Sequence, residues 1–239
     1  GMSLDINGEG VLFIGPSGTK KTELFWRLFS ERPEVALHSY DTLFVRYGGG
    51  LAAADNPERK MYMPTNTVEA WDDLAKLFDK CKCENVTTRV EDCRNEKHRT
   101  TDSCPLNSGA PYSYSCARKS HAMLEPYWLG GMARHVKRID IRHVLILRND
   151  PVTTAMQKLQ PEDALHMLEA GYPAGTAGGK QEPWYNGHLL LKSSERFDLQ
   201  KRFFGKLLRS AAVYQLNAGT ATVTEMAQHV LHSVGVTGR

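Results

Sequence analysis

The amino-acid sequence predicts an α/β fold, with a mixed central sheet flanked by helices, on three observations. A short apolar run bounded by glycines, "GVLFIG" (10–15), passes into the glycine-containing stretch "GPSGTKKTEL" (15–24). Apolar residues then recur at helical spacing, which completes the order strand, loop, helix. Strand-like and helix-like segments continue to alternate, and no internal repeat or low-complexity tail interrupts them. We therefore expect a single α/β domain over residues 1–239.

The N-terminal half of the chain begins with the strand at 10–15 and the helix that follows it. A second strand is predicted at "VALHSYDTLFV" (35–45), and it places Asp41 near the far end of that strand. The three glycines at 48–50 then break the strand pattern. The predicted buried face of the first helix comprises Leu24, Phe25, Leu28 and Phe29.

The C-terminal half contains two predicted strands and three predicted helices. "HVLILRND" (143–150) is typical of a buried strand, and "AAVYQLNAG" (211–219) is a second apolar run of strand length. "PEDALHMLEAG" (161–171) has proline at a first helical position, carboxylates in the first turn and a terminal glycine, so it predicts a helix. "FDLQKRFFGKLL" (197–208) predicts a helix with one buried face. The Thr-x-x-Glu pattern at 222–225 is a capping box for a last helix.

Residues 79–120 are polar, rich in cysteine and nearly free of apolar periodicity, so we expect an irregular insertion there. All five cysteines lie in it, and an odd number in a cytosolic chain argues against a disulfide framework. One interpretation is a structural zinc ion, because thiolates bind zinc tetrahedrally and would order a segment that lacks a core. The other is reduced thiols without a metal. The candidate zinc ligands are Cys81, Cys83, Cys93 and Cys104, with Cys116 and His98 as further donors.

The hydrophobic content, the net charge and the absence of long apolar stretches limit the classes of protein to which the chain can belong. The hydrophobic content of 41% is ordinary for a soluble globular chain. A net charge of +3, without a concentrated basic stripe or a recognition motif, gives no support for nucleic acid as a partner. The first residues lack the pattern of a signal peptide, and no apolar stretch approaches the roughly 18 residues that would suggest a membrane span. We expect a cytoplasmic protein with no membrane partner.

The stretch at 15–24 departs at one position from a phosphate-binding loop. Such a loop reads GxxxxGK[ST], and Gly15, Lys21 and Thr22 are in register, whereas Lys20 stands where the second glycine belongs. In a working loop Lys21 would reach the β- and γ-phosphates of ATP and the hydroxyl of Thr22 would bind Mg²⁺. The alternative is a chance glycine-rich turn, which the correct flanking strand and helix disfavour. The expected nucleotide-binding residues are Gly15, Pro16, Ser17, Gly18, Thr19, Lys20, Lys21 and Thr22.

A magnesium ion in a phosphotransferase needs an acidic partner, which usually comes from the end of a neighbouring strand. Asp41 is the candidate for this role. The alternative is that Asp41 accepts hydrogen bonds from local turn amides, as strand-terminal aspartates often do.

At this point the sequence resembles a known family. "GPSGTKKTEL" is similar to the kinase loop GLSGTGKTTL of ATP-dependent phosphoenolpyruvate carboxykinase, and HPr kinase/phosphorylase has a related loop. "LHSYDTLFV" (37–45) resembles the metal-binding strand end of the family, and "ARKSHAM" (117–123) resembles its segment TRVSYPI. "VYQLNAGT" (213–220) resembles the strand end VWLVNTGW near the nucleotide. The shared order of these segments from about residue 10 to 220 carries the resemblance.

The resemblance implies an ATP- and Mg²⁺-dependent kinase, with a metabolite or a protein as the unnamed phosphoryl acceptor. It assigns Lys21, Asp41 and Arg118 as catalytic residues, with Thr22 and Asp41 as magnesium ligands and Arg118 facing the γ-phosphate. An arginine there would neutralise charge that develops on the transferred group.

Three departures from the family motivate an alternative. Lys20 replaces a glycine, Tyr40 replaces the first of two aspartates, and the phosphate loop begins so early that we expect no counterpart of the carboxykinases' N-terminal domain. Tyr40 cannot accept a proton at neutral pH as a carboxylate would. The alternative function is therefore a catalytically inactive ATP-binding regulatory module with a degenerate phosphate loop.

Overall fold

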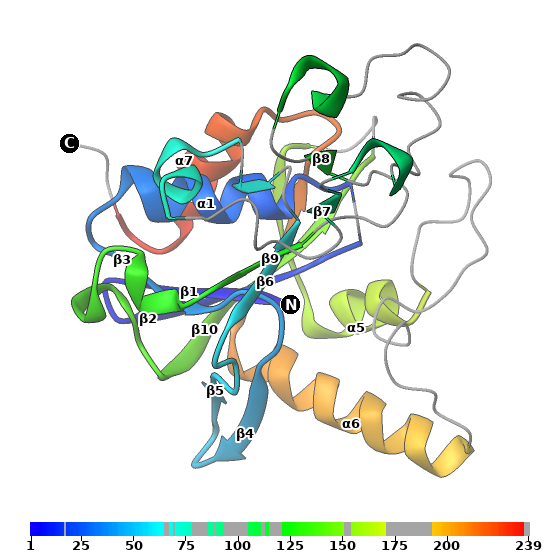
Figure 1. Ribbon diagram of the computed structural model, residues 1–239. Helices are drawn as coiled ribbons and strands as arrows, with labels where there is room; N and C mark the ends of the chain where they lie inside the picture. The colour runs from blue at the N-terminus through cyan, green and yellow to red at the C-terminus, as the bar shows by residue number, and fades with distance from the viewer. Residues whose placement is uncertain are drawn as a thin grey trace. The chain divides into compact units, whose positions relative to one another are not determined.

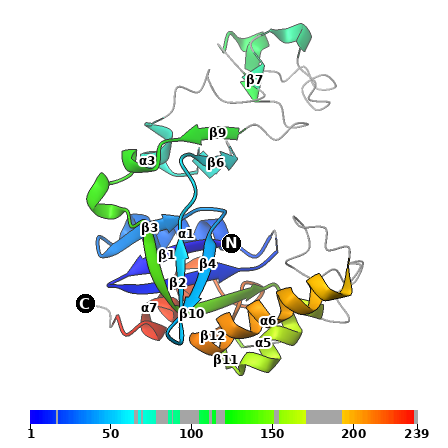
Figure 2. The same ribbon diagram turned by 90° about the horizontal axis from the view of Figure 1, so that it is seen from below.

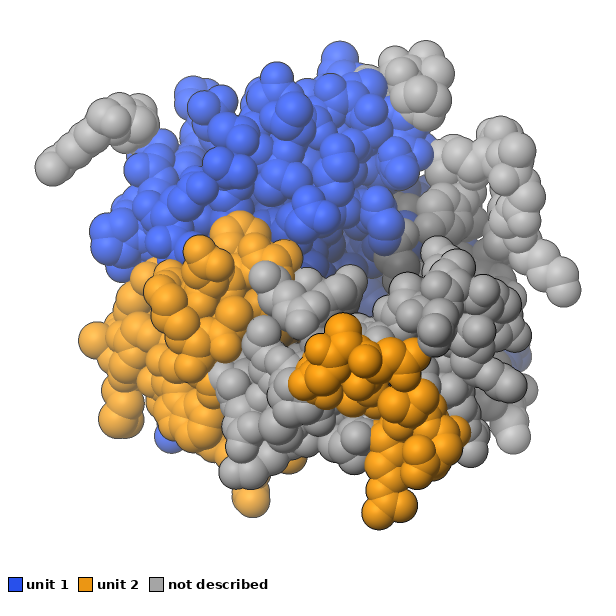
Figure 3. Space-filling model, turned by 45° about the horizontal axis from the view of Figure 1, so that its top comes forward, with its two compact units in different colours: residues 1–57, 136–239 blue, residues 58–135 orange. Residues whose placement is uncertain are grey.

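The computed structural model divides the chain into two compact units, which Figure 3 colours separately. The first comprises residues 1–57 and 136–239, and the second comprises residues 58–135. The residues described in this structure are 1–16, 18–64, 67–68, 70–77, 86–87, 89–92, 105–110, 113–114, 121–150, 154–170 and 193–236. The expectation of one domain over the whole chain stays a prediction.

The described residues of the first unit form a mixed α/β structure built on an eight-stranded sheet, which is drawn in Figure 1. Its main path has the strand order β11-β12-β10-β2-β1-β3, and β4 and β5 form a hairpin that pairs with β10. Strand β10 runs parallel to β2 and β12, whereas β1 is antiparallel to β2 and to β3. The strands are β1 (Met2–Ile6), β2 (Glu9–Ile14), β3 (Val35–Ser39), β4 (Phe44–Gly48), β5 (Leu51–Asp55), β10 (Arg138–Arg148), β11 (Met156–Leu159) and β12 (Ala212–Asn217).

Helices cover both faces of this sheet, which explains why β10 is buried without alternation over residues 143–147. Helices α1 (Lys21–Glu31) and α7 (Val223–Ser233) lie on one side, and α5 (Pro161–Ala170) and α6 (Ser194–Ser210) lie on the other (Figure 1). Successive side chains of a strand point to opposite faces of the sheet. Alternate residues of β10 therefore pack beneath α5 and α6, and the others pack on the opposite face. The core beneath α5 and α6 includes Leu12, Val144, Ile146, Leu168, Leu207, Leu208 and Val213.

Most predicted elements are confirmed. The predicted capping box forms, with the Thr222 hydroxyl accepting from the Glu225 amide and the Glu225 side chain accepting from the Thr222 amide. Helix α6 is longer than its sequence pattern indicated, because Ser193 caps it and a first turn with its own carboxylate, Glu195, precedes the apolar repeat. Strand β10 likewise begins at Arg138, five residues before the apolar run at 143, since its polar first residues pair with β5.

The prediction of one strand over 35–45 is wrong. The chain leaves β3 after Ser39 and starts β4 at Phe44, and the Ser39 hydroxyl donates to the carbonyl of Thr42 at 2.6 Å to close the turn between them. The glycines at 48–50 end β4 as predicted and form a hairpin turn, with φ of 58° at Gly49 and 79° at Gly50. Two positive φ values in succession define the turn type that matches the twist of a hairpin.

The second unit is described only in parts. Strands β6 (Met61–Pro64) and β9 (His121–Leu124) pair side by side, as Figure 2 also shows, and Lys60 forms an ion pair with Glu125 next to them. Short elements also occur, namely α3 (Asp72–Ala75), the pair β7 (Val86–Thr87) and β8 (Ser113–Tyr114), and 3₁₀ turns at 90–92, 105–108, 126–128 and 132–134. The expected insertion at 79–120 falls in this unit, and all five cysteines lie outside the described residues. In the described part of the chain no helix is both long and apolar enough to cross a membrane.

Candidate functional site

The carboxyl ends of the parallel strands β2, β10 and β12 meet at one edge of the sheet. Ligands of open α/β sheets commonly bind at this edge, because the loops that leave the strands converge there. The loop that follows β2 leads directly into α1, which begins at Lys21. Because β1 is antiparallel to both β2 and β3, the end of β3 and the adjoining Asp41 also lie at this edge.

Tight packing fixes the start of the loop at 15–20. A Cβ atom on Gly15 would lie 2.8 Å from the carbonyl oxygen of Leu147, so a larger residue does not fit against β10. Gly18 has a φ of 85°, in the region that favours glycine. The hydroxyl of Thr19, which is 1% exposed, donates to the carbonyl of Pro16 at 2.9 Å. Thr19 therefore shapes the loop from within, and Ser17 lies outside the described residues.

Lys20 keeps the backbone conformation that glycine would adopt most easily. Its φ of 55° and ψ of 18° are left-handed, which costs a non-glycine residue on the order of 1 kcal/mol. Its ammonium group donates to the carbonyls of Ala218 at 2.9 Å and Ala221 at 3.1 Å. Lys20 thus preserves the shape of the loop and ties it to the segment between β12 and α7.

Lys21 folds back over the loop. Its Nζ atom donates to the carbonyl oxygen of Gly15 at 2.9 Å. Burial lowers the pKa of Lys21, since a charged group loses hydration there, and the nearby carboxylate of Asp41 opposes this shift. The first backbone hydrogen bond of α1 runs from the amide of Leu24 to the carbonyl of Lys20 at 2.9 Å. The amides of residues 21–23 therefore have no carbonyl partner within the helix.

The structure therefore brings together three of the residues predicted from the sequence. Lys21, Thr22 and Asp41 lie at one sheet edge, with the lysine charge and the aspartate charge close enough to influence each other. Thr22 is half-buried and Asp41 is exposed. A hydroxyl, a carboxylate and a lysine beside a helix N-terminus are a donor set suited to a phosphorylated ligand with a hard cation.

Tyr40, which stands where the resemblance expects an aspartate, is a packing residue. It is 5% exposed, and its ring contacts Phe25 edge-on at 5.9 Å and Trp26 at 5.8 Å between ring centroids. Tyr40 thus extends the aromatic cluster on α1. His38 is also structural, because it is fully buried and its Nδ1 atom is hydrogen-bonded to the hydroxyl of Ser3 at 2.7 Å.

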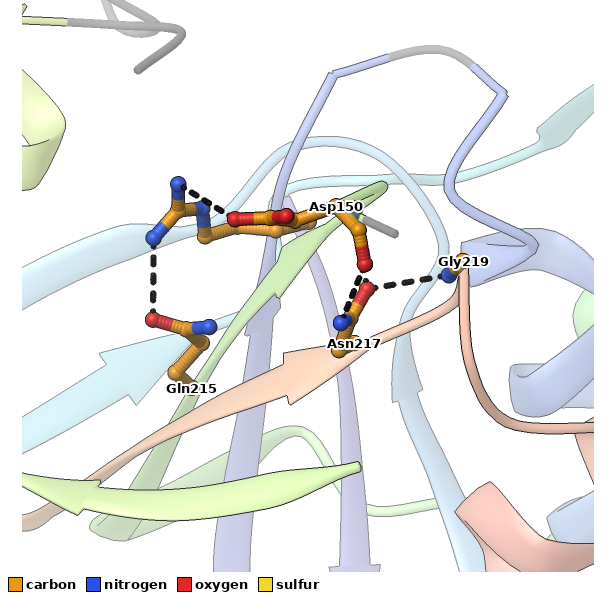
Figure 4. A network of polar contacts seen from close by, with 5 residues as sticks. Asp150, Gln215, Asn217 and Gly219 are labelled. Atoms are coloured by element: carbon orange, nitrogen blue, oxygen red, sulfur yellow. Dashed lines mark hydrogen bonds and ion pairs between the residues drawn. The ribbon is translucent and has the colours of Figure 1, made fainter. Parts of the chain in front are cut away.

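A buried polar network at the same sheet edge was not found by sequence reasoning (Figure 4). Asn217, which is fully buried, accepts through Oδ1 from the amides of Asp150 and Gly219, both at 3.0 Å. Its Nδ2 atom donates to the carbonyl of Asp150 at 2.5 Å. A Cβ atom on Gly219 would lie 2.8 Å from the Asp150 carbonyl oxygen, so glycine is required there. The network locks the end of β10 to the end of β12.

Arg148 extends this network. Its guanidinium donates to Oε1 of Gln215 at 3.0 Å and pairs with the carboxylate of Asp150 at 3.4 Å. Burial lowers the pKa of Arg148, and Asp150 opposes that shift. A signal for the network was present in the sequence, since "RND" and "QLNAG" place polar residues directly after apolar runs, but their pairing depends on strand order.

The remaining predicted site residues have no described geometry. Arg118 and the four candidate zinc ligands Cys81, Cys83, Cys93 and Cys104 lie outside the described residues, as do Cys116 and His98. Within the described ranges no three His, Cys, Asp or Glu side chains gather as a metal site would require. The zinc site and the role of Arg118 stay predictions.

Comparison with known proteins gives limited information. No protein-family model and no curated protein matches the chain. Among solved structures, the chain is similar to the HPr(Ser) kinase/phosphatase from Coxiella burnetii at 12% sequence identity. The match covers 66% of this chain and 68% of that one, with a TM-score of 0.34. The sheet topology makes the chain a mixed α/β protein, and its chemistry is argued from its own residues.

Proposed function

We propose that the chain is an ATP- and Mg²⁺-dependent phosphotransferase of the HPr kinase and phosphoenolpyruvate carboxykinase type. The observation that supports it is the position of Lys21, folded over the loop at 15–20 and within electrostatic range of Asp41. The acceptor is a metabolite or a protein that carries a nucleophilic oxygen or nitrogen.

The residues have distinct roles in this proposal. The loop amides and the N-terminus of α1 bind phosphate oxygens, and Lys21 exchanges its hydrogen bond with Gly15 for one to the β- and γ-phosphates. Thr22 and Asp41 would hold Mg²⁺, which would supply neutralisation of the phosphate charge. The γ-phosphoryl group passes to the acceptor as its bond to the β-phosphate oxygen breaks, with ADP as the leaving group. Arg118, by resemblance, faces the transferred group.

A second candidate function is ATP binding without transfer, and one observation favours it. Tyr40 is buried in the aromatic cluster on α1, so the carboxylate that would accept a proton is replaced by a packing residue. An acceptor hydroxyl would then lose its proton to solvent or to another base, which slows transfer by the roughly 10²- to 10⁴-fold that general base catalysis supplies. Binding of ATP would be unaffected.

Calorimetric titration with ATP, with and without Mg²⁺, tests the shared part of both functions. We expect Mg²⁺-dependent binding that Lys21→Ala abolishes and Asp41→Asn weakens. The matched control is Lys201→Ala, because Lys201 on α6 pairs with Glu169 on α5 and lies far from the loop in the chain. No binding at millimolar ATP would overturn both functions. Transfer from γ-labelled ATP to candidate acceptors then separates the first from the second.

A further inference from the structure

A cavity of about 380 Å³ opens between the β4–β5 hairpin and the last turns of α6. The hairpin contributes Tyr47, Leu51 and two of the glycines between them, and the helix contributes Lys206, Arg209 and Ser210. Figure 1 shows the C-terminal end of α6 beside this hairpin. Since all of these elements belong to the first unit, the cavity is part of one compact body.

Positive charge is concentrated on one wall of the cavity. Lys206 and Arg209 are three residues apart, so they project from the same face of α6. In the described part of the chain neither has a carboxylate partner, whereas Lys201 on the same helix pairs with Glu169 at 3.1 Å. None of the residues that line the cavity is acidic. Two cations without counter-charges facing a cavity favour an anionic ligand.

The opposite wall is aromatic, neutral and held in place. Tyr47 stacks on Phe203 with 5.7 Å between ring centroids, and its hydroxyl donates to the Phe203 carbonyl at 2.7 Å. Burial raises the pKa of Tyr47 to about 12, so its hydroxyl adds no negative charge near neutral pH. The Nζ atom of Lys206 lies 6.0 Å from the Tyr47 ring centroid. The ring of Tyr47 is therefore held in a fixed position beside Lys206, where a ligand in the cavity would contact it.

The hairpin that forms this wall is anchored to the sheet. The carboxylate of Asp55 pairs with Arg46 and with Arg138, both at 2.6 Å, and thereby fastens β4 and β5 to the first residues of β10. The phosphate loop packs instead on Leu147, near the last residue of β10. His143 of β10 is in register with Ala212, the first residue of β12 after α6, and with Val11 near the start of β2. The phosphate loop follows the last residue of β2, so the cavity lies toward the amino ends of the parallel strands and the phosphate loop lies at their carboxyl ends.

We propose that this cavity is a second ligand site, which binds a small molecule carrying a phosphate group on a ring. The phosphate lies between Lys206 and Arg209, and the ring lies against Tyr47 and Leu51. The site differs from the phosphate loop in residues and in place, so it does not depend on nucleotide binding at residues 15–22.

Phenyl phosphate is a suitable probe, because it combines the two features in one small molecule. We expect millimolar binding by calorimetry or by shifts in nuclear magnetic resonance spectra, weaker binding of inorganic phosphate, and none of phenol. Lys206→Gln and Arg209→Gln each weaken binding roughly tenfold, the effect of one charge-assisted hydrogen bond. Lys201→Gln, on the same helix, leaves binding unchanged. Thermal unfolding of each variant shows that the fold is intact.

Lys21→Ala distinguishes the two phosphate sites. If phenyl phosphate binds the cavity, Lys21→Ala leaves its affinity unchanged, and binding persists in the presence of ATP and Mg²⁺. The proposal is overturned if Lys21→Ala abolishes binding, if both α6 variants bind like the wild-type chain, or if phenol binds as well as phenyl phosphate. Absence of binding at millimolar probe also overturns it, whatever the result with ATP.

Discussion

The Nζ atom of Lys20 lies 2.9 Å from the carbonyl oxygen of Ala218, 198 residues further along the chain. A second hydrogen bond from the same ammonium group reaches Ala221 at 3.1 Å. Lys20, which interrupts the loop pattern, thus links the loop at 15–20 to the segment between β12 and α7. The left-handed backbone of Lys20 is conformationally unfavourable, and the two hydrogen bonds of its side chain offset this cost.

Replacing Lys20 separates these two effects. Lys20→Met removes both hydrogen bonds but keeps the left-handed backbone under strain, and we expect a loss of about 1–3 kcal/mol in the free energy of unfolding. Lys20→Gly removes the same bonds and relieves the strain, so it should be less destabilising than Lys20→Met by on the order of 1 kcal/mol. Urea unfolding of the two variants measures the difference. Equal stability of the variants would contradict the strain assigned to Lys20.

Gly15 and Gly48 make a matched pair for testing the packing of the loop. In Gly15→Ala the new Cβ atom would meet the Leu147 carbonyl oxygen at 2.8 Å, so β2 or the loop must shift. We expect a loss of about 1–3 kcal/mol and weaker ATP binding. Gly48→Ala has no atom within 4 Å of the new Cβ and should change stability by less than about 0.5 kcal/mol. Similar midpoints of chemical unfolding for both would refute the close packing at Gly15.

Asn217 is expected to be among the most sensitive polar positions in the sheet. Asn217→Ala leaves the part-buried amides of Asp150 and Gly219 without their acceptor, and we expect a loss of roughly 1–3 kcal/mol in the free energy of unfolding. Asn217→Asp keeps an acceptor but places a carboxylate oxygen against the Asp150 carbonyl, so it should also destabilise. The control is Gln157→Ala, an exposed residue on β11. Hydrogen exchange at Gly219 should accelerate in the Asn217 variants and not in the control.

Two buried histidines predict a loss of stability in mild acid. Burial lowers the pKa of His38 and of His143, the latter despite an opposing contribution from Glu9. In the unfolded chain these groups take up protons as the pH falls through about 6.5, whereas the folded chain resists protonation until lower pH. The unfolded state then binds more protons, so the free energy of unfolding falls as the pH drops below about 6.5. Urea unfolding between pH 5 and 8 measures this slope.

His143→Gln provides the control for that pH dependence. The variant removes one titrating group in the middle of β10, and its slope below pH 6.5 should be smaller than that of the wild-type chain. An unchanged slope would show that His143 titrates alike in the folded and unfolded states.

Features that depend on near neighbours in the chain could be predicted from the sequence. Periodicity and end signals within a few residues predicted the strand, loop and helix that begin at residue 10, the capping box at 222–225, and helices at 161–171 and 197–208, the last of which extends further at both ends in the structure. Lys21 and Thr22 were found for the same reason, because their spacing from Gly15 is local. Such signals depend on residues that are close together in the sequence, so they can be recognised without knowing the order of the strands.

Features that join distant segments depend on the tertiary structure. β1 and β11 are short strands whose place depends on their partners, and Tyr40, which was predicted to lie in a strand, follows β3 and packs its ring on α1. The ties of Lys20 to Ala218 and of Asn217 to Asp150 require the order β12-β10-β2, which brings the ends of three parallel strands to one edge. Strand order is set by the burial of whole faces against helices, so the pattern of any single segment does not reveal it.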